Sequence, residues 1–113
     1  MHELSLAVEV VHLLETHAHE LRRITRLTLD IGTLSCVDEQ ALRTALETAM
    51  AGTLAEGADI EIQTVEALAR CQDCDQTFHP PDRIEPCPHC GSFKKTWLKG
   101  EDFKLRSVEG IPA

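Results

Sequence analysis

Four cysteines in two matched pairs constrain the fold of this chain more than any other sequence feature. The pairs are Cys71-x-x-Cys74 and Cys87-x-x-Cys90, and twelve residues separate them. Each pair can wrap a tight turn that directs two sulfurs at one ion, and Gly91 favours such a turn after the second pair. Two such turns complete the tetrahedral sulfur site of structural Zn²⁺. The spacing therefore predicts a zinc ribbon with a structural metal, because cysteine fills all four positions and leaves none for a catalytic water.

Other uses of the cysteines fit the sequence less well. Disulfides are rare in proteins without a secretory signal, and the N-terminus has no basic segment followed by an apolar run. The C-P-H-C sequence of residues 87–90 also occurs in oxidising thioredoxin-like proteins, where the first cysteine opens a long helix. Here Gly91 follows the motif at once, so a redox protein is only a minor alternative. The fifth cysteine, Cys36, is expected to be a small buried hydrophobe.

Hydrophobic periodicity predicts two helices and three strands outside the cysteine region. The helices are predicted at residues 3–20 and 38–51, and the strands at residues 24–31, 59–66 and 102–109. The predicted core positions of the helices are Leu4, Ala7, Val8, Val11, Leu14 and Ala18 in the first, and Leu42, Ala45, Leu46, Ala49 and Met50 in the second. Asp38 is a suitable N-cap for the second helix. Residues 110–113 are expected to fray at the C-terminus.

The order of these elements predicts an α+β fold, αβαβ…β. Two helices that cover one face of a small three-stranded sheet bury both apolar stripes. Residues 102–109 alternate too regularly for a zinc knuckle, so they are expected to return to this sheet. The four-cysteine zinc ribbon, residues 67–101, is then a domain inserted between two strands. Residues 1–66 plus 102–113 form the α/β domain that it interrupts.

Charge and composition exclude several classes of function. The chain has 19 acidic and 11 basic residues, a formal net charge of −8, whereas a general nucleic-acid-binding protein needs a basic face. No window approaches the roughly 20 apolar residues of a membrane span, so we expect a cytoplasmic protein without membrane contact. The sequence offers no nucleophile–base pair, phosphate-binding loop or paired carboxylates in a plausible cleft, so it is not expected to be an enzyme.

The N-terminus, Met1-His2-Glu3, offers a second kind of metal site. The terminal amine, the backbone nitrogen of His2 and the His2 imidazole can chelate one ion in fused rings. Nitrogen-rich, tetragonal sites of this kind suit Ni²⁺ or Cu²⁺. Glu3 can add a carboxylate oxygen or its own amide nitrogen. Taken alone, a terminal histidine is more often simply solvated, so this segment predicts a metal site only together with the rest of the chain.

Three segments of the sequence occur together in a family of metal-handling proteins. They are residues 1–6 (M-H-E-L-S-L), residues 31–37 (I-G-T-L-S-C-V), and the two cysteine pairs, of which the second continues as C-P-H-C-G-S. In this order and over nearly the whole chain, the sequence resembles the hydrogenase nickel-incorporation protein family, HypA/HybF. The combination of a terminal M-H-E with a four-cysteine ribbon is specific, although neither part is specific alone.

The resemblance implies a nickel metallochaperone that binds Ni²⁺ at its N-terminus and delivers it to the large subunit of [NiFe] hydrogenase. The nickel site of the family maps to Met1, His2 and Glu3, and its zinc ligands map to the four paired cysteines. The resemblance also implies a HypB-like GTPase of the same maturation pathway as a partner and, in some organisms, a urease accessory protein. The second helix departs from the family, which often has phenylalanines there, and this departure is expected to alter packing but not metal chemistry.

The main alternative is a zinc-ribbon adaptor that binds a protein or nucleic acid and transports no metal. It predicts that zinc is the only tightly bound metal and that His2 is dispensable. His79 and His89, near the cysteines, are expected to be surface or second-layer imidazoles, although some members of the family are thought to exchange such histidines with zinc ligands. His12 and His19 are expected to lie on a solvated helix face rather than in a second metal site.

Overall fold

The computed structural model describes residues 2–113, except for the side chain of His2, and has two helices and six strands in that range. The helices are α1 (His2–His17) and α2 (Glu39–Met50), and the strands outside the cysteine region are β1 (Leu21–Gly32), β2 (Asp59–Val65) and β6 (Phe103–Pro112). The cysteine region contains β3 (Leu68–Cys71), β4 (Thr77–Phe78) and β5 (Lys95–Lys99). None of the described helices is both long and apolar enough to span a membrane.

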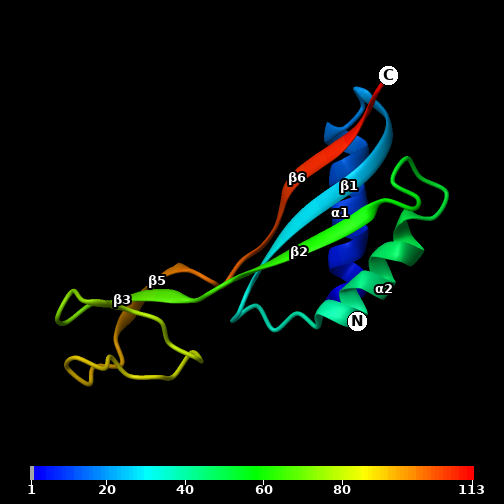
Figure 1. Ribbon diagram of the computed structural model, residues 1–113. Coiled ribbons are helices and arrows are strands. Elements are labelled where there is room, and N and C mark those ends of the chain that lie inside the picture. Colours follow the sequence, from blue (N-terminus) through cyan, green and yellow to red (C-terminus); the bar gives the residue numbers. More distant parts are fainter. Residues whose placement is uncertain (1) are drawn as a thin grey trace. The chain divides into compact units, whose positions relative to one another are not determined.

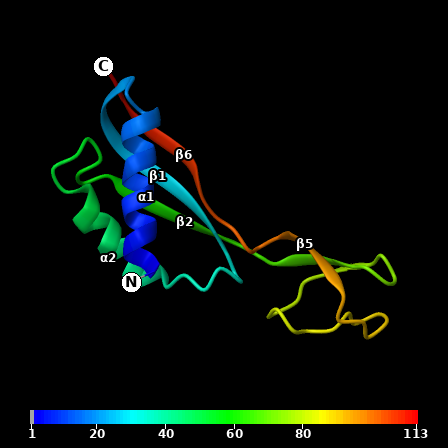
Figure 2. The ribbon, with the colours of Figure 1, turned by 180° about the vertical axis from the view of Figure 1, so that it is seen from behind.

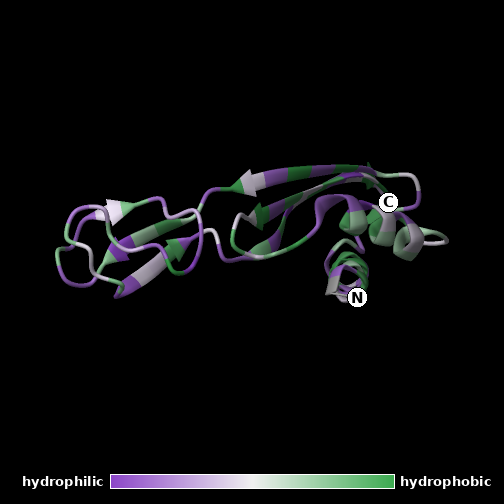
Figure 3. Ribbon diagram, turned by 90° about the horizontal axis from the view of Figure 1, so that it is seen from below, coloured by the Kyte–Doolittle hydropathy of each residue, from purple (hydrophilic) through white to green (hydrophobic). Residues whose placement is uncertain are grey.

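The strands form two three-stranded sheets, in the orders β2-β1-β6 and β4-β3-β5. Both helices lie on the same side of the first sheet, as Figures 1 and 3 show, and the view from behind in Figure 2 shows α1 running across it. Strands β3, β4 and β5 all fall between β2 and β6 in the chain. The predicted α+β class and the insertion of the cysteine region before the last strand of the first sheet are therefore confirmed.

Contacts within the chain define two compact units. The first contains residues 1–29, 37–62 and 105–113, and the second contains residues 30–36 and 63–104. The segment 30–36 groups with the cysteine region because its backbone is hydrogen-bonded to that region. The Gly32 N–H donates to the Asp102 carbonyl at 2.8 Å, and the Leu34 N–H donates to the Gly100 carbonyl at 2.9 Å.

Helix α2, at its predicted positions, and strand β1 supply much of the core of the first unit. Leu42, Leu46 and Met50 are buried on α2, and Leu27 and Leu29 are buried on β1. These positions follow the 3.6-residue period of a helix and the two-residue period of a strand.

The start of α2 is fixed by the predicted cap. Asp38 has extended backbone angles, and its Oδ1 accepts the N–H of Ala41 at 3.0 Å. Such a bond satisfies one of the amides that the first turn of a helix leaves without a partner.

The buried face of α1 differs from the predicted one. Ala7 and Leu14 are buried as expected, but Leu4 and Val8 are 47% and 57% exposed, and Val10 is buried instead. Valine and leucine surround the middle of this helix, so its sequence period alone does not select one face. The tertiary packing of the helix decides which face is covered.

Two further predictions about single segments were wrong. Cys36 is exposed rather than buried, and its backbone has a positive φ of 60°. Residues 110–112 continue β6 instead of fraying, and the Ala113 N–H donates to the Glu20 carbonyl at 2.9 Å. Pro112 is accommodated because β6 is an edge strand, where a proline need not donate to a ladder.

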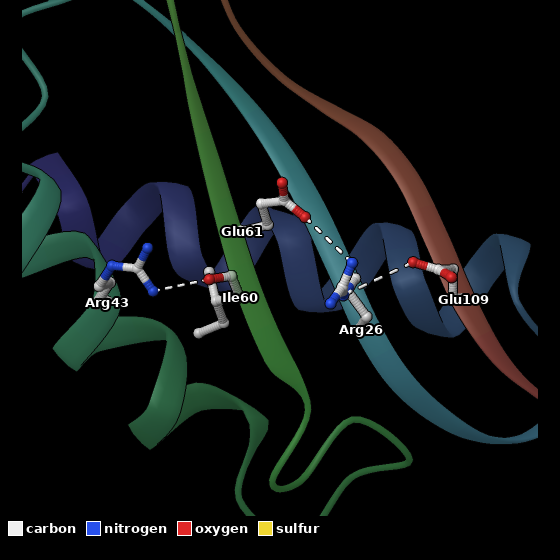
Figure 4. Close-up of polar contacts among 5 residues, drawn as sticks. All are labelled: Arg26, Arg43, Ile60, Glu61 and Glu109. Carbon is white, nitrogen blue, oxygen red and sulfur yellow. Dashed lines mark hydrogen bonds and ion pairs between the residues drawn. The ribbon is translucent and has the colours of Figure 1, made fainter.

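The side of the first sheet that faces away from the helices has a row of charged side chains. Arg26 in the central strand lies between Glu61 and Glu109, with nitrogen–oxygen distances of 3.4 and 3.8 Å (Figure 4). On α2, the Arg43 side chain donates to the Ile60 carbonyl at 2.8 Å and ties the helix to β2. Exposed ion pairs contribute only about 0–1 kcal/mol each, so this row favours the observed strand order without dominating stability.

Candidate metal centre

The structure brings the four predicted zinc ligands together. The Sγ atoms of Cys71, Cys74, Cys87 and Cys90 all lie within 4.8 Å of one another. The closest pairs are Cys71 with Cys90 at 3.5 Å and Cys74 with Cys87 at 3.6 Å, and none of these cysteines is in a disulfide. Zn–S bonds of about 2.3 Å in a tetrahedron require sulfur–sulfur distances of about 3.8 Å. The four-sulfur donor set and its spacing therefore fit a tetrahedral ion such as Zn²⁺.

Two turns of the same geometry build this cluster. In each turn the first cysteine donates its N–H to the carbonyl five residues on, at 2.9 Å for Cys71 and 2.8 Å for Cys87. Its own carbonyl accepts the N–H of the residue four positions on, Asp75 or Gly91, at 3.0 and 2.8 Å. That residue has a positive φ, 66° at Asp75 and 78° at Gly91. Glycine reaches this region freely and aspartate tolerates it.

Asp75 was not identified from the sequence. Its position after Cys74 matches the position of Gly91 after Cys90, so aligning the two cysteine pairs would have shown that both residues need a left-handed conformation. The tolerance of aspartate for that conformation was the available signal.

Backbone N–H groups point at the sulfurs and influence their ionisation. The N–H of Cys74, 3.5 Å from the Cys71 sulfur, lowers the pKa of Cys71 to about 7, although burial opposes this shift. At Cys74 the N–H of Gln76 also acts to lower the pKa, but burial and the neighbouring thiols of Cys87 and Cys71 together raise that pKa to about 12. Cys71 therefore ionises readily, whereas ionisation of Cys74 is unfavourable in the absence of a cation. A bound cation would compensate the negative charge of several thiolates.

The core around the cluster is small. Ala69, Cys71, Phe78 and Cys87 are buried together, and Trp97 packs against them. A side-chain hydrogen bond from Ser92 to Asp73 links the two cysteine turns. With so few apolar side chains, the ribbon needs a bound metal to supply much of its stability.

Arg83 fixes the loop between the two cysteine pairs. It donates to the Glu101 carboxylate at 2.7 Å and to the Leu34 carbonyl at 3.1 Å. Its guanidinium lies 5.9 Å from the centre of the Trp97 ring, a distance suited to a cation–π contact. No sequence motif distinguishes a single arginine in a proline-rich loop, so sequence analysis did not identify this residue.

Of the three predicted nickel ligands, only Glu3 has a described side chain. Met1 lies outside the described residues, and so does the side chain of His2. Helix α1 begins at His2, and the Glu3 Oε2 accepts the N–H of Asp38 at 3.1 Å. The carboxylate thus lies at the N-terminal end of α2, where a negative charge is favourable.

The other histidines are not gathered into a metal site. His79 lies 2.9 Å from the Ala67 carbonyl and 3.7 Å from the Glu66 carboxylate. Within the part of the chain that the structure describes, the four cysteines form the one group of metal-binding side chains that converges. His12 and His19 therefore contribute to no such group.

Comparison with known proteins identifies relatives over the full length of the fold. A family model described as "Hydrogenase/urease nickel incorporation, metallochaperone, hypA" matches residues 1–110. Hydrogenase maturation factor HypA of Psychromonas ingrahamii is 37% identical over 111 residues, which cover 96% of this chain and 97% of that protein. Hydrogenase maturation factor HybF of Salmonella typhimurium is 38% identical over 111 residues, which cover 96% of this chain and 98% of that protein.

A solved structure supports the same assignment. The solution structure of the nickel metallochaperone HypA from Helicobacter pylori superimposes with a TM-score of 0.75 and 26% sequence identity, and the match covers 98% of each chain. This full-length match agrees with the resemblance that the M-H-E terminus and the two cysteine pairs indicated. The chain belongs to the HypA family of hydrogenase and urease nickel-incorporation metallochaperones.

Proposed function

We propose that this protein binds Ni²⁺ at its N-terminus and delivers it to the large subunit of [NiFe] hydrogenase. The observation that carries the proposal is the family match over residues 1–110, which includes the M-H-E terminus. Relatives of 37–38% identity are hydrogenase maturation factors by name. A HypB-like GTPase and, in some organisms, a urease accessory protein are the further partners that membership of this family implies.

The proposed nickel ligands are nitrogens. The amine of Met1, the backbone and imidazole nitrogens of His2 and the amide nitrogen of Glu3 make a four-nitrogen set, which suits Ni²⁺. The first N–H groups of a helix have no acceptor within the helix, and α1 begins at His2. The contact between the Glu3 carboxylate and the Asp38 N–H supports a ligand role for the Glu3 amide rather than for its oxygen atoms.

Zinc at the four cysteines is proposed to be structural and nickel to be the transported ion. Cysteine occupies every position of the sulfur cluster, which leaves no ligand position for exchange. A chelate at a chain terminus, in contrast, allows an acceptor ligand to attack before the donor has fully released the ion. Nickel affinity should fall at low pH, because protons compete for the same nitrogens.

The proposal is tested by titrating Ni²⁺ into zinc-loaded protein with its native N-terminus. One nickel per chain is expected, and His2→Ala should bind little. His12→Ala is the matched control, because it removes an exposed α1 histidine that the proposal does not use. A Gly-Ser extension before Met1 should also abolish binding, since it moves the amine away from His2.

The outcomes separate the candidate functions. Equal nickel binding by the native protein and His2→Ala would refute the N-terminal site. No nickel binding by any variant would favour the zinc-ribbon adaptor. Delivery is tested in cells that lack their own family member, where the native chain should restore nickel in the hydrogenase large subunit and His2→Ala should not.

A further inference from the structure

The sheet of the zinc ribbon has an open edge at β5. In the order β4-β3-β5, β5 has a neighbouring strand on one side only among the residues that the structure describes. The Gln72 N–H donates to the Lys94 carbonyl at 2.9 Å, so the backbone groups of Lys94 face β3. Successive residues of an antiparallel strand alternate in the side to which their N–H and C=O groups point, so those of Lys95 and Trp97 point away from β3. The Lys95 carbonyl accepts the Gln72 side chain at 3.2 Å. The N–H of Lys95 and both backbone groups of Trp97 then face the open edge.

This edge is basic, although the protein as a whole is acidic. Residues 86–100 contain Lys94, Lys95 and Lys99 and no acidic residue, a formal charge of +3, whereas the rest of the chain has 19 acids and 8 bases. In the described part of the chain, none of these lysines forms an ion pair. The Lys95 ammonium lies 5.8 Å from the Trp97 ring instead. The positive charge at the edge is thus available to a partner.

Exposed apolar side chains flank the same edge. Phe93, just before β5, is 67% exposed, and Leu98, near its end, is 44% exposed. Leu98 lies where the pairing of β5 with β3 shifts its register. Apolar side chains beside an unpaired strand lose their exposed surface when another strand is added.

We propose that the β5 edge, residues 93–99, is a docking surface for an extended acidic segment of another protein, which adds as a fourth strand of the ribbon sheet. Main-chain hydrogen bonds to Lys95 and Trp97 supply affinity, as in other cases of strand addition. Carboxylates that meet Lys94 and Lys99 supply selectivity for an acidic segment. This surface is separate from the N-terminal nickel site, and its function does not depend on nickel.

Lysines on an edge strand can also prevent a protein from pairing with its own copies. The two roles predict different behaviour when the lysines are removed. If the lysines only guard the edge, their removal produces dimers and leaves binding of an acidic strand unchanged. If they recognise a partner, their removal weakens that binding.

The experiment titrates the zinc-loaded full chain with an eight-residue peptide of alternating glutamate and valine, without nickel. Saturable binding is expected, with the largest amide chemical-shift changes at Lys95 and Trp97. Lys94→Glu with Lys99→Glu should weaken binding about tenfold or more, since each exposed ion pair contributes at most about a factor of five. The matched control is Arg22→Glu with Lys104→Glu, two exposed residues outside residues 93–99, which should retain nearly full affinity.

The proposal would be overturned by the absence of saturable peptide binding, by an equal loss in both double variants, or by shift changes centred away from β5. Lys94→Ser with Lys99→Ser, followed by sedimentation, tests the guarding role. New dimers with unchanged peptide affinity would assign the lysines to that role alone. Retained binding by a peptide with prolines at its central positions would also contradict strand addition, because proline cannot donate to the ladder.

Discussion

One backbone angle closes each cysteine turn. Asp75 and Gly91 occupy equivalent positions with φ of 66° and 78°, and a β-carbon placed on Gly91 would meet no atom within 4 Å. The cost of a side chain at Gly91 is therefore conformational rather than steric, about 1–2 kcal/mol for an ordinary residue. Aspartate at position 75 avoids part of this cost.

Gly91→Ala should therefore weaken zinc binding about tenfold, because roughly 1.4 kcal/mol corresponds to a factor of ten. Asp75→Gly should bind zinc as tightly as the native chain, since it places the permissive residue in the equivalent position. Competition with a chromophoric chelator measures both affinities. Equal affinity of Gly91→Ala and native protein would show that the turn does not require the left-handed conformation.

The ionisation of Cys71 should make retention of a metal at the four cysteines depend on pH. Its pKa in the folded chain is lowered to about 7, below the usual value of a free thiol near 8.5. Stabilisation from the thiolate is thus complete above the unfolded pKa and is lost as the pH falls through 7. We expect a chelator to remove zinc increasingly well between pH 8 and pH 6, with proton release on zinc binding in a weakly buffered solution. Zinc loss that does not vary over this range would contradict the assignment.

At the scale of elements, three backbone segments meet closely where the chain enters and leaves the ribbon. A β-carbon on Gly32 would lie 2.1 Å from the Gly100 carbonyl oxygen, and one on Gly100 would lie 2.3 Å from the Ala67 Cα. Backbone atoms cannot move aside as the end of a flexible side chain can. These glycines therefore permit a contact that no other residue allows.

Gly32→Ala should destabilise the zinc-loaded protein by roughly 1–3 kcal/mol, the usual cost of overpacking. Gly52→Ala is a suitable control, because position 52 has a positive φ but open space around it, so its cost of about 1–2 kcal/mol is conformational alone. Chemical unfolding measures the difference, followed by the fluorescence of Trp97 for the ribbon and by far-ultraviolet circular dichroism for the helices. If Gly32→Ala proved the less destabilising of the two, the close contact would not be important.

The elements that sequence analysis predicted are those with a clear period. Helix α2 has one apolar face, and its buried residues followed from spacing alone. Strand β1 buries the predicted leucines but also Thr28 and Asp30, which a simple alternation would leave exposed. Strands β3, β4 and β5 were missed because they have only four, two and five residues, too few for an alternating pattern. At the metal centre the cysteine pairs were found by their spacing, whereas Arg83 acts through contacts distant in sequence, such as its bond to Leu34.

The whole molecule combines a unit with an apolar core and a unit with a metal cluster. In the first unit, α1, α2 and the sheet bury many leucine, isoleucine and valine side chains. In the second, the buried cluster consists of two cysteines, one alanine and one phenylalanine. The two units therefore have different sources of stability and should respond differently to loss of metal.

Removal of zinc by a chelator should disorder the ribbon and leave the helices folded. Trp97 is the one tryptophan and the chain has no tyrosine, so near-ultraviolet circular dichroism reports mainly on the ribbon, whereas far-ultraviolet circular dichroism reports on α1 and α2. Cys90→Ser should behave like the chelated protein, and Cys36→Ser should retain zinc. Simultaneous loss of both signals would mean that the two units fold as one cooperative body.

The contact of Ala67 with Gly100 has a consequence for how such a protein can change over generations. The segment of 32 residues between them therefore begins and ends at nearly the same point in space. Insertion or deletion of a few residues in this segment would not alter the spacing of the strands before and after it. Its entropic cost is small, because the entropy of closing a loop rises only slowly with loop length. Mutation can therefore lengthen, shorten or replace the ribbon while the rest of the chain keeps its fold.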